Sequence, residues 1–195
     1  MIEVKECSKA FGTVKAVNKA TLDVGVREVF GLVGSNGAGK STLLRMMAGI
    51  IRPDEGEIQI DGMPVYENEE AKKLFFYISD DSYFPANYTA MDLVRFYRNF
   101  YPQFRTRFFH ELMEQFHLEE NRRIATFSKG MKHRLTFVRS MLNNPELWFL
   151  DEPTTGLDPA IGRQIIDIVK QKKSEGTTVF LTTHNMNVAD ELCDR

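Results

Sequence analysis

A short apolar run, Val29–Val33, leads directly into a glycine-rich loop and then into a helical pattern. The loop and the start of the helix comprise Gly34, Ser35, Asn36, Gly37, Ala38, Gly39, Lys40, Ser41 and Thr42. Glycines allow the backbone to curl until successive N–H groups point inward, and the helix start adds the positive end of its dipole. Lys40 adds a mobile positive charge. The sequence therefore predicts a strand, a loop and a helix that hold the phosphates of a nucleotide.

The residue after Lys40 is expected to bind a metal ion. The hydroxyl of Ser41 is a hard oxygen donor of the kind that Mg²⁺ prefers, and Mg²⁺ accompanies ATP in enzymes that use it. A glycine-rich turn before a helix also occurs without any nucleotide, which is the alternative interpretation. The preceding strand and the apolar positions of the following helix favour the nucleotide; these positions are Leu43, Leu44, Met46 and Met47.

The composition fits one soluble domain. With 195 residues, of which 43% are hydrophobic, the chain can bury a sizeable core. The net charge of −2 gives no long-range attraction for nucleic acid or an anionic membrane surface. No window approaches the ~18 apolar residues of a membrane span, so we expect any membrane crossing to come from another polypeptide or a missing segment. The two cysteines, Cys7 and Cys193, lie near opposite ends of the chain and favour a reducing compartment.

Short apolar runs alternate with helical patterns along the chain. We expect strands at Ile2–Val4, Val29–Val33, Ile58–Ile60, Phe75–Ile78, Leu147–Leu150 and Val179–Leu181. We expect helices at Thr42–Gly49, Ala90–Tyr101, Arg107–Phe116, Lys132–Leu142, Ala160–Ser174 and Asn185–Leu192. Asp61 and Gly62 are expected to form the turn of a hairpin in an N-terminal antiparallel β portion. The alternation predicts an α/β fold, a P-loop NTPase core with a mostly parallel, doubly wound sheet.

The interval from about Tyr83 to Asn144 carries helices without strands between them. We interpret this interval as a helical insertion into the α/β domain. Its first helix has an apolar face at Leu93, Phe96, Tyr97 and Phe100. Such a face is either part of the core or, together with Tyr83 and Phe84, a groove that receives a helix of a partner.

Two acidic residues follow the buried strand Leu147–Leu150. Asp151 is expected to bind Mg²⁺ through water, and Glu152 to orient and deprotonate the water that attacks the terminal phosphate. A strand end capped by surface acids is the alternative interpretation. The phosphate loop elsewhere in the chain favours the catalytic interpretation.

His184 is the third residue after the last predicted strand, Val179–Leu181. The imidazole of His184 can donate a hydrogen bond to a phosphate oxygen, although a single histidine is more often a surface residue. Ligands bind beyond the carboxyl ends of parallel strands. We therefore expect Lys40, Asp151 and His184 to meet at one edge of the sheet.

Together these motifs resemble the ATP-binding cassette (ABC) ATPases, the nucleotide-binding domains of ABC transporters, over nearly the whole chain. The segment Leu150–Pro159 is similar to the Walker B and D-loop motifs of that family, and Thr183–His184 to its switch histidine. Phe127–Met131 resembles the family signature, which kinases and GTPases lack. Phe11 stands where family members stack an aromatic ring on adenine; a lone Phe is otherwise a core residue.

The resemblance implies a pair of chains. Ser128, Lys129 and Gly130 stand at the start of a second helix, whose N-terminus can bind phosphate. In the family, two domains form a head-to-tail dimer around two ATP molecules, so the Lys40 loop of one chain would face Ser128 and Gly130 of the other, in a homodimer or a heterodimer. A simple Ser N-cap is the alternative interpretation of Ser128.

The resemblance further implies an ATPase that powers export. Such a subunit binds a separate transmembrane permease and is cytoplasmic, peripheral on the inner face of the cell membrane. We expect ATP and Mg²⁺ as cofactors and no nucleic acid as partner.

Three features depart from the family pattern. Asp80 replaces the usual Gln and, as a carboxylate, can still bind Mg²⁺. Lys129 occupies the first glycine position of the signature. Both variants look like those in the branch of drug, antibiotic and peptide exporters. Because the chain ends at Arg195, soon after the switch histidine, we expect one domain over residues 1–195, with a helical subdomain at about 83–144 and a truncated C-terminal end.

The sequence is also compatible with two other functions. One is a soluble ABC ATPase that acts on the ribosome or on DNA, although such proteins usually carry tandem cassettes, coiled coils or basic extensions. The other is an ATP-gated regulatory module with little hydrolysis, which the departures at Asp80 and Lys129 allow.

Overall fold

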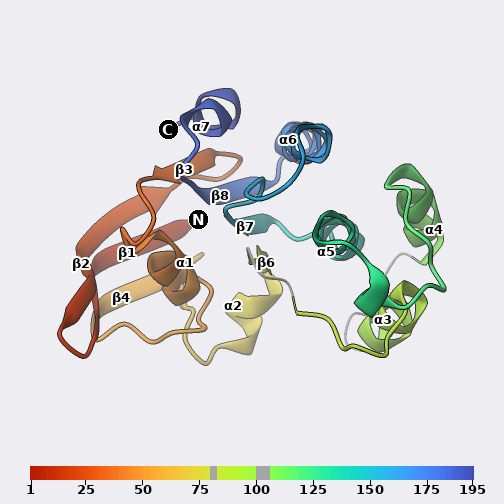
Figure 1. Ribbon diagram of the computed structural model, residues 1–195. Helices are drawn as coiled ribbons and strands as arrows, with labels where there is room; N and C mark the ends of the chain where they lie inside the picture. The colour runs from red at the N-terminus through yellow and green to blue at the C-terminus, as the bar shows by residue number, and fades with distance from the viewer. Residues whose placement is uncertain (80–82, 100–105) are drawn as a thin grey trace. The chain divides into compact units, whose positions relative to one another are not determined.

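The computed structural model describes residues 1–79, 83–99 and 106–195 (Figure 1). These residues form two compact units. The first unit comprises Met1–Ser79, Pro145–Pro153 and Ile166–Arg195. The second comprises the described residues of 80–144 together with Thr154–Ile165. Each strand and helix expected from the sequence is present, although several begin or end at different residues.

An antiparallel sheet in the first unit has the strand order β2-β1-β4-β5. Its strands are β1 (Ile2–Phe11), β2 (Val14–Val24), β4 (Glu55–Ile60) and β5 (Met63–Pro64). Asp61 and Gly62 join β4 to β5 with φ values of 49° and 75°, the two positive values of a two-residue hairpin turn. The predicted turn is confirmed. Sequence analysis missed β2 because this strand is largely exposed and lacks a regular apolar alternation.

A parallel sheet in the first unit has the strand order β3-β8-β7-β6. Its strands are β3 (Val29–Val33), β6 (Phe75–Ile78), β7 (Leu147–Asp151) and β8 (Thr178–Thr183). Every residue of β7 and β8 is buried, as expected for central parallel strands. The α/β class with a parallel sheet and an antiparallel β portion is therefore confirmed, but the antiparallel strands form a sheet of their own.

Helix α1 (Lys40–Met47) lies between the two sheets, and α7 (Met186–Leu192) covers the other face of the parallel sheet (Figure 1). The buried side chains of α1 join residues of both sheets in one apolar core; they are Leu43, Leu44, Met46 and Met47. The short helix α2 (Glu69–Lys73), which the sequence did not predict, is capped by Asn68. This core fixes the start of α1 against the carboxyl ends of the parallel strands.

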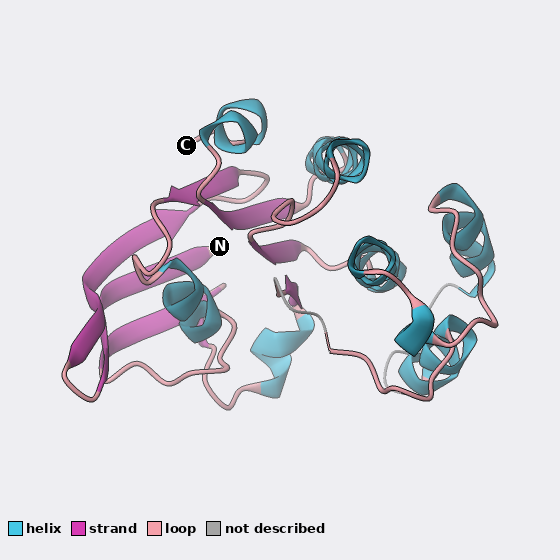
Figure 2. Ribbon diagram, viewed as in Figure 1, coloured by secondary structure: helices cyan, strands magenta, loops and turns pink. Residues whose placement is uncertain are grey.

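The second unit is helical in its described residues (Figure 2). It contains α3 (Ala90–Arg98), α4 (Thr106–Gln115), the short helix η1 (Ile124–Thr126), α5 (Lys129–Asn143) and the first part of α6 (Pro159–Ser174). A capping box at Thr89 and Asp92 begins α3. Helix α5 begins three residues before the expected Lys132 because Ser128 caps it.

The apolar face expected on α3 is only partly a core face. Leu93 is buried and Tyr97 is half-buried, whereas Phe96 is 44% exposed. Phe100 and Tyr101 lie outside the described residues. In the described ranges, none of the helices combines the length and the apolar character that a membrane span needs.

Candidate functional site

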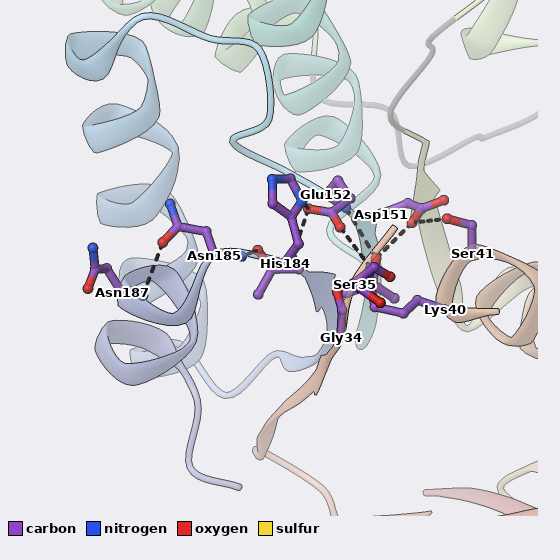
Figure 3. A network of polar contacts seen from close by, with 11 residues as sticks. Gly34, Ser35, Lys40, Ser41, Asp151, Glu152, His184, Asn185 and Asn187 are labelled. Atoms are coloured by element: carbon purple, nitrogen blue, oxygen red, sulfur yellow. Dashed lines mark hydrogen bonds and ion pairs between the residues drawn. The ribbon is translucent and has the colours of Figure 1, made fainter. Parts of the chain in front are cut away.

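The glycine-rich loop lies between β3 and α1, at the carboxyl end of the parallel sheet (Figure 3). Ser35, Asn36, Gly37 and Ala38 are exposed, and Gly34, Gly39, Ser41 and Thr42 are half-buried. Gly37 and Gly39 have φ values of 82° and 87°, a left-handed conformation that glycine adopts without strain. The N–H of Gly34 donates to the carbonyl oxygen of Thr183 at 3.3 Å. The loop is thereby tied to the end of β8.

Lys40 is buried within this loop, with 7% of the residue exposed. Its Nζ donates to the carbonyl oxygens of Gly34 at 2.7 Å and Ser35 at 3.1 Å (Figure 3). The same atom lies 3.2 Å from Glu152 Oε1. A buried ammonium group requires such partners because removing an unpaired charge from water is costly. Lys40 therefore places a fixed positive charge inside the curl of the loop.

Substitution of Gly39 is expected to destabilise the protein more than substitution of Gly37. A Cβ atom at Gly39 would lie 2.0 Å from the carbonyl oxygen of Ala16 in β2, whereas one at Gly37 would meet no atom within 4 Å. Gly37→Ala therefore adds only backbone strain, about 1 kcal/mol, but Gly39→Ala must also separate two backbone segments and is expected to cost about 3 kcal/mol. Urea denaturation measures both free energies of unfolding. Equal values would contradict the close approach of the loop to β2.

Asp151 is the last residue of β7, and hydroxyl groups from three elements donate to its carboxylate. Oδ1 accepts from Ser41 Oγ at 2.8 Å and from Thr182 Oγ1 at 2.7 Å. Oδ2 accepts from the hydroxyl of Tyr77 at 3.3 Å. Asp151 is only 1% exposed, so these hydrogen bonds replace its hydration. They fix the carboxylate next to the first turn of α1.

Glu152 has a φ of 49°, which is unusual for a residue with a side chain. Its N–H donates to the carbonyl oxygen of Thr182 at 3.1 Å, and this bond holds the strained backbone. Its carboxylate lies between Lys40 and His184: Oε2 accepts from the His184 N–H at 3.2 Å and is 2.9 Å from His184 Nδ1. With this backbone conformation, the Glu152 carboxylate points toward Lys40 and His184, beside the loop.

His184 follows the last residue of β8, and 41% of its side chain is exposed. The next residue, Asn185, caps α7 by accepting from the N–H of Asn187 at 3.0 Å (Figure 3). The ends of β3, β7 and β8 thus bring together Lys40, the acidic pair and His184. This grouping lies entirely within the first unit.

The signature residues lie in the second unit. Ser128 is exposed and caps α5 by accepting from the N–H of Met131 at 3.2 Å. A Cβ atom at Gly130 would lie 2.8 Å from Ile161 Cδ1, so the start of α5 packs closely on α6. A Cβ atom at Gly156 would lie 3.1 Å from Lys129 Nζ, which puts the end of the Lys129 side chain against the D-loop segment.

Of two further residues predicted for the site, Phe11 and Asp80, the structure describes only Phe11. Phe11, at the end of β1, is 51% exposed, which excludes the alternative of a core residue. Lys9 Nζ lies 5.8 Å from the centroid of the Phe11 ring. Asp80, the expected metal ligand, lies outside the described residues.

Sequence analysis missed Tyr77 and Thr182, both of which contact Asp151. Thr182 pairs directly with Asp151 between β8 and β7, so knowledge of the strand register would have identified Thr182 as a contact of Asp151. Tyr77 pairs with Phe149, which lies two residues before Asp151 and on the same face of β7. Neither residue belongs to a local motif, so the sheet alone brings them to the site.

The donor atoms fit Mg²⁺ and phosphate. The hydroxyl of Ser41 and the carboxylate of Asp151 are hard oxygen ligands, and their oxygens lie 2.8 Å apart. The Lys40 ammonium group and the N-terminus of α1 supply the positive charge that phosphate requires. A parallel sheet that presents these groups at its strand ends defines a P-loop nucleotide-binding domain.

Comparison with known proteins narrows this class. The family model described as ABC transporter matches residues 17–155. The chain belongs to the ABC transporter family, and the family predicted from the sequence is confirmed.

Two curated relatives and one solved structure illustrate the similarity. The fluoroquinolones export ATP-binding protein of Mycobacterium tuberculosis (strain CDC 1551 / Oshkosh) is 40% identical over 188 residues, which are 92% of this chain and 60% of the relative. The Nod factor export ATP-binding protein I of Rhizobium etli is 36% identical over 201 residues, 100% of this chain and 63% of the relative. A dimeric post-hydrolysis state of an ATP-binding cassette bound to ADP and Pi has a TM-score of 0.84 and 26% identity, over 98% of this chain and 91% of that one. The chain spans 60 to 67% of the length of such curated relatives.

Proposed function

We propose that this chain is the ATP-binding and ATP-hydrolysing subunit of an ABC exporter that works with a separate transmembrane permease. The observation that carries this proposal is the Glu152 carboxylate, which is held beside Lys40 at the mouth of the phosphate loop. Two relatives are named as ATP-binding proteins of export systems, which supports the transport direction.

In this proposal the loop binds the phosphates, and the acidic pair supplies a metal ligand and a general base. The N–H groups of residues 34–39, the N-terminus of α1 and Lys40 bind the phosphates. Ser41 and Asp151 hold Mg²⁺, which when bound neutralises negative charge on the phosphates. Glu152 accepts a proton from the attacking water, and His184 donates to a terminal phosphate oxygen. Phe11 offers its exposed ring to adenine.

Phosphate binding also changes the partners of Glu152. Lys40 pairs with the Glu152 carboxylate at 3.2 Å in this structure. A bound triphosphate competes for the same ammonium group because it carries more negative charge. The Glu152 carboxylate is then released from Lys40 while His184 still holds it, and it is free to accept a proton from water.

Phosphate release assays and copurification test this function together. We expect Mg²⁺-dependent release of phosphate from ATP and copurification with a membrane permease. Retention of nucleic acid in a salt-sensitive manner would instead indicate a ribosome- or DNA-associated ATPase. ATP binding without phosphate release would indicate a regulatory module.

The signature helix supports a head-to-tail dimer. Ser128 and Lys129 are exposed at the N-terminus of α5, where a helix can bind a second phosphate group. A solved relative at 26% identity is described as dimeric and bound to ADP and Pi. Each ATP would lie between the Lys40 loop of one chain and Ser128 and Gly130 of the other.

A bulky cation at Ser128 is expected to prevent this dimer. In a Glu152→Gln background, we expect ATP to shift the protein from monomer to dimer in light scattering. Ser128→Arg should abolish that shift, because the side chain fills the space that the other chain's phosphate requires, and should leave ATP affinity of the monomer within about threefold. Ser174→Arg, the same change at an exposed position of α6, is the control. A dimer that forms normally in Ser128→Arg contradicts the arrangement.

The helical unit offers a surface for the permease. Tyr83 is 85% exposed and Phe96 is 44% exposed, which is unusual for large aromatic side chains. Nearby, Arg139 donates to the hydroxyl of Tyr97 at 3.0 Å and lies 5.6 Å from the Phe84 ring centroid. We propose that this aromatic surface receives a helix of the permease.

A further inference from the structure

Tyr77 lies on β6, next to the strand that carries the acidic pair. Tyr77 pairs in register with Phe149, so its side chain is on the same face of the sheet as Phe149 and Asp151. The tyrosine is long enough to reach one residue pair further, and its hydroxyl is 3.3 Å from Asp151 Oδ2. Its ring packs against the apolar core below the site. The ring is therefore anchored, and only the hydroxyl takes part in the polar network.

The direction of the hydrogen bond between Tyr77 and Asp151 follows from the two groups. The Tyr77 hydroxyl carries one hydrogen, and an ionised carboxylate can only accept, so Tyr77 donates to Asp151 Oδ2.

The two oxygens of Asp151 have separate partners. Oδ1 accepts from Ser41 and Thr182, and Oδ2 accepts from Tyr77. Without the Tyr77 bond, the carboxylate could rotate about its last torsion, because that torsion is broad and shallow. Such a rotation would move Oδ1 away from Ser41. The Tyr77 hydroxyl thus limits the orientation of the carboxylate relative to Ser41.

We propose that Tyr77 is a positioning residue that holds the Asp151 carboxylate in the orientation required for metal binding. This inference rests on the proposed function, in which Asp151 and Ser41 hold Mg²⁺. The 3.3 Å distance is long for a hydroxyl donor, so the effect is expected to be moderate.

The experiment compares nucleotide affinity with and without Mg²⁺. Isothermal titration calorimetry with a non-hydrolysable ATP analogue gives one dissociation constant in Mg²⁺ and one in EDTA. In Tyr77→Phe, we expect the gain in affinity due to Mg²⁺ to fall about fivefold, as for the loss of one hydrogen bond, while affinity in EDTA is unchanged. Tyr66→Phe is the control, because Tyr66 is an exposed tyrosine whose ring lies 5.7 Å from the Arg52 guanidinium and which belongs to none of these motifs.

Two results would overturn the inference. They are an unchanged Mg²⁺ gain in Tyr77→Phe, and an equal loss of affinity in Mg²⁺ and in EDTA. Failure of the unmodified protein to bind the analogue at all is a different result, because it would remove the proposed function itself.

Discussion

Replacing Glu152 with glutamine is expected to lower the rate of ATP hydrolysis by at least about 100-fold and to leave ATP affinity nearly unchanged. Glutamine keeps the shape of the side chain and can still accept from the backbone N–H of His184, which donates to Glu152 at 3.2 Å. An amide oxygen cannot serve as a base for the attacking water. Loss of general-base help raises the barrier by about 3–5 kcal/mol. Phosphate release and a nucleotide fluorescence titration measure the two quantities.

The same charge change at an exposed residue is the control for this variant. Glu114→Gln, in α4, should hydrolyse ATP at the unmodified rate, because Glu114 is exposed and lies in the other unit. If Glu152→Gln also hydrolysed ATP at the unmodified rate, Glu152 could not be the base. If it lost both hydrolysis and binding, its role would be structural, through its contacts with Lys40 and His184.

Local motifs were sufficient to predict the elements that carry the site. The strand Val29–Val33 has the same bounds in the structure as in the sequence prediction. The apolar run before Asp151 is a fully buried strand, because a continuous apolar run between turns is typical of a central parallel strand. Residue types and spacing along one short segment determine these features, so no knowledge of the rest of the chain is needed.

Contacts between distant segments could not be predicted in this way. Thr182 reaches Asp151 because β8 pairs with β7 in a particular register, and nothing in the segment around Thr182 states that register. The contact from Tyr77 depends on a further strand. The positive φ of Glu152 is likewise held from β8, by the carbonyl oxygen of Thr182. These features arise from the sheet as a whole.

Exposure explains the secondary structure that the sequence missed. Strand β2 has few buried residues, so its pattern gives a weak signal, although it pairs with β1 along most of its length. Phe11 shows the opposite case, because its residue type favours burial whereas its position beside the hairpin leaves it exposed. The formation of β2 and the exposure of Phe11 therefore depend on pairing between neighbouring strands and not on the local residue pattern.

Removal of the Lys40 side chain is expected to have the largest effect on nucleotide binding. Lys40→Ala should weaken ATP affinity by at least about 100-fold, because charge-assisted hydrogen bonds to phosphate are about twice as strong as neutral ones. The variant should also be less stable without nucleotide, by about 3 kcal/mol, because the buried Glu152 carboxylate loses the ammonium group that lies 3.2 Å from Oε1. Calorimetry and urea denaturation measure the two losses.

A double variant separates these two effects. In Lys40→Ala/Glu152→Gln the buried carboxylate is replaced by a neutral amide, so most of the lost stability should return. ATP affinity should stay low, because the cation that the phosphates require is still missing. Recovery of both quantities would mean that Lys40 serves only to neutralise Glu152. Recovery of stability alone would assign Lys40 to the phosphates, and the 3.2 Å ion pair would then be the contact that Lys40 exchanges for phosphate when ATP binds.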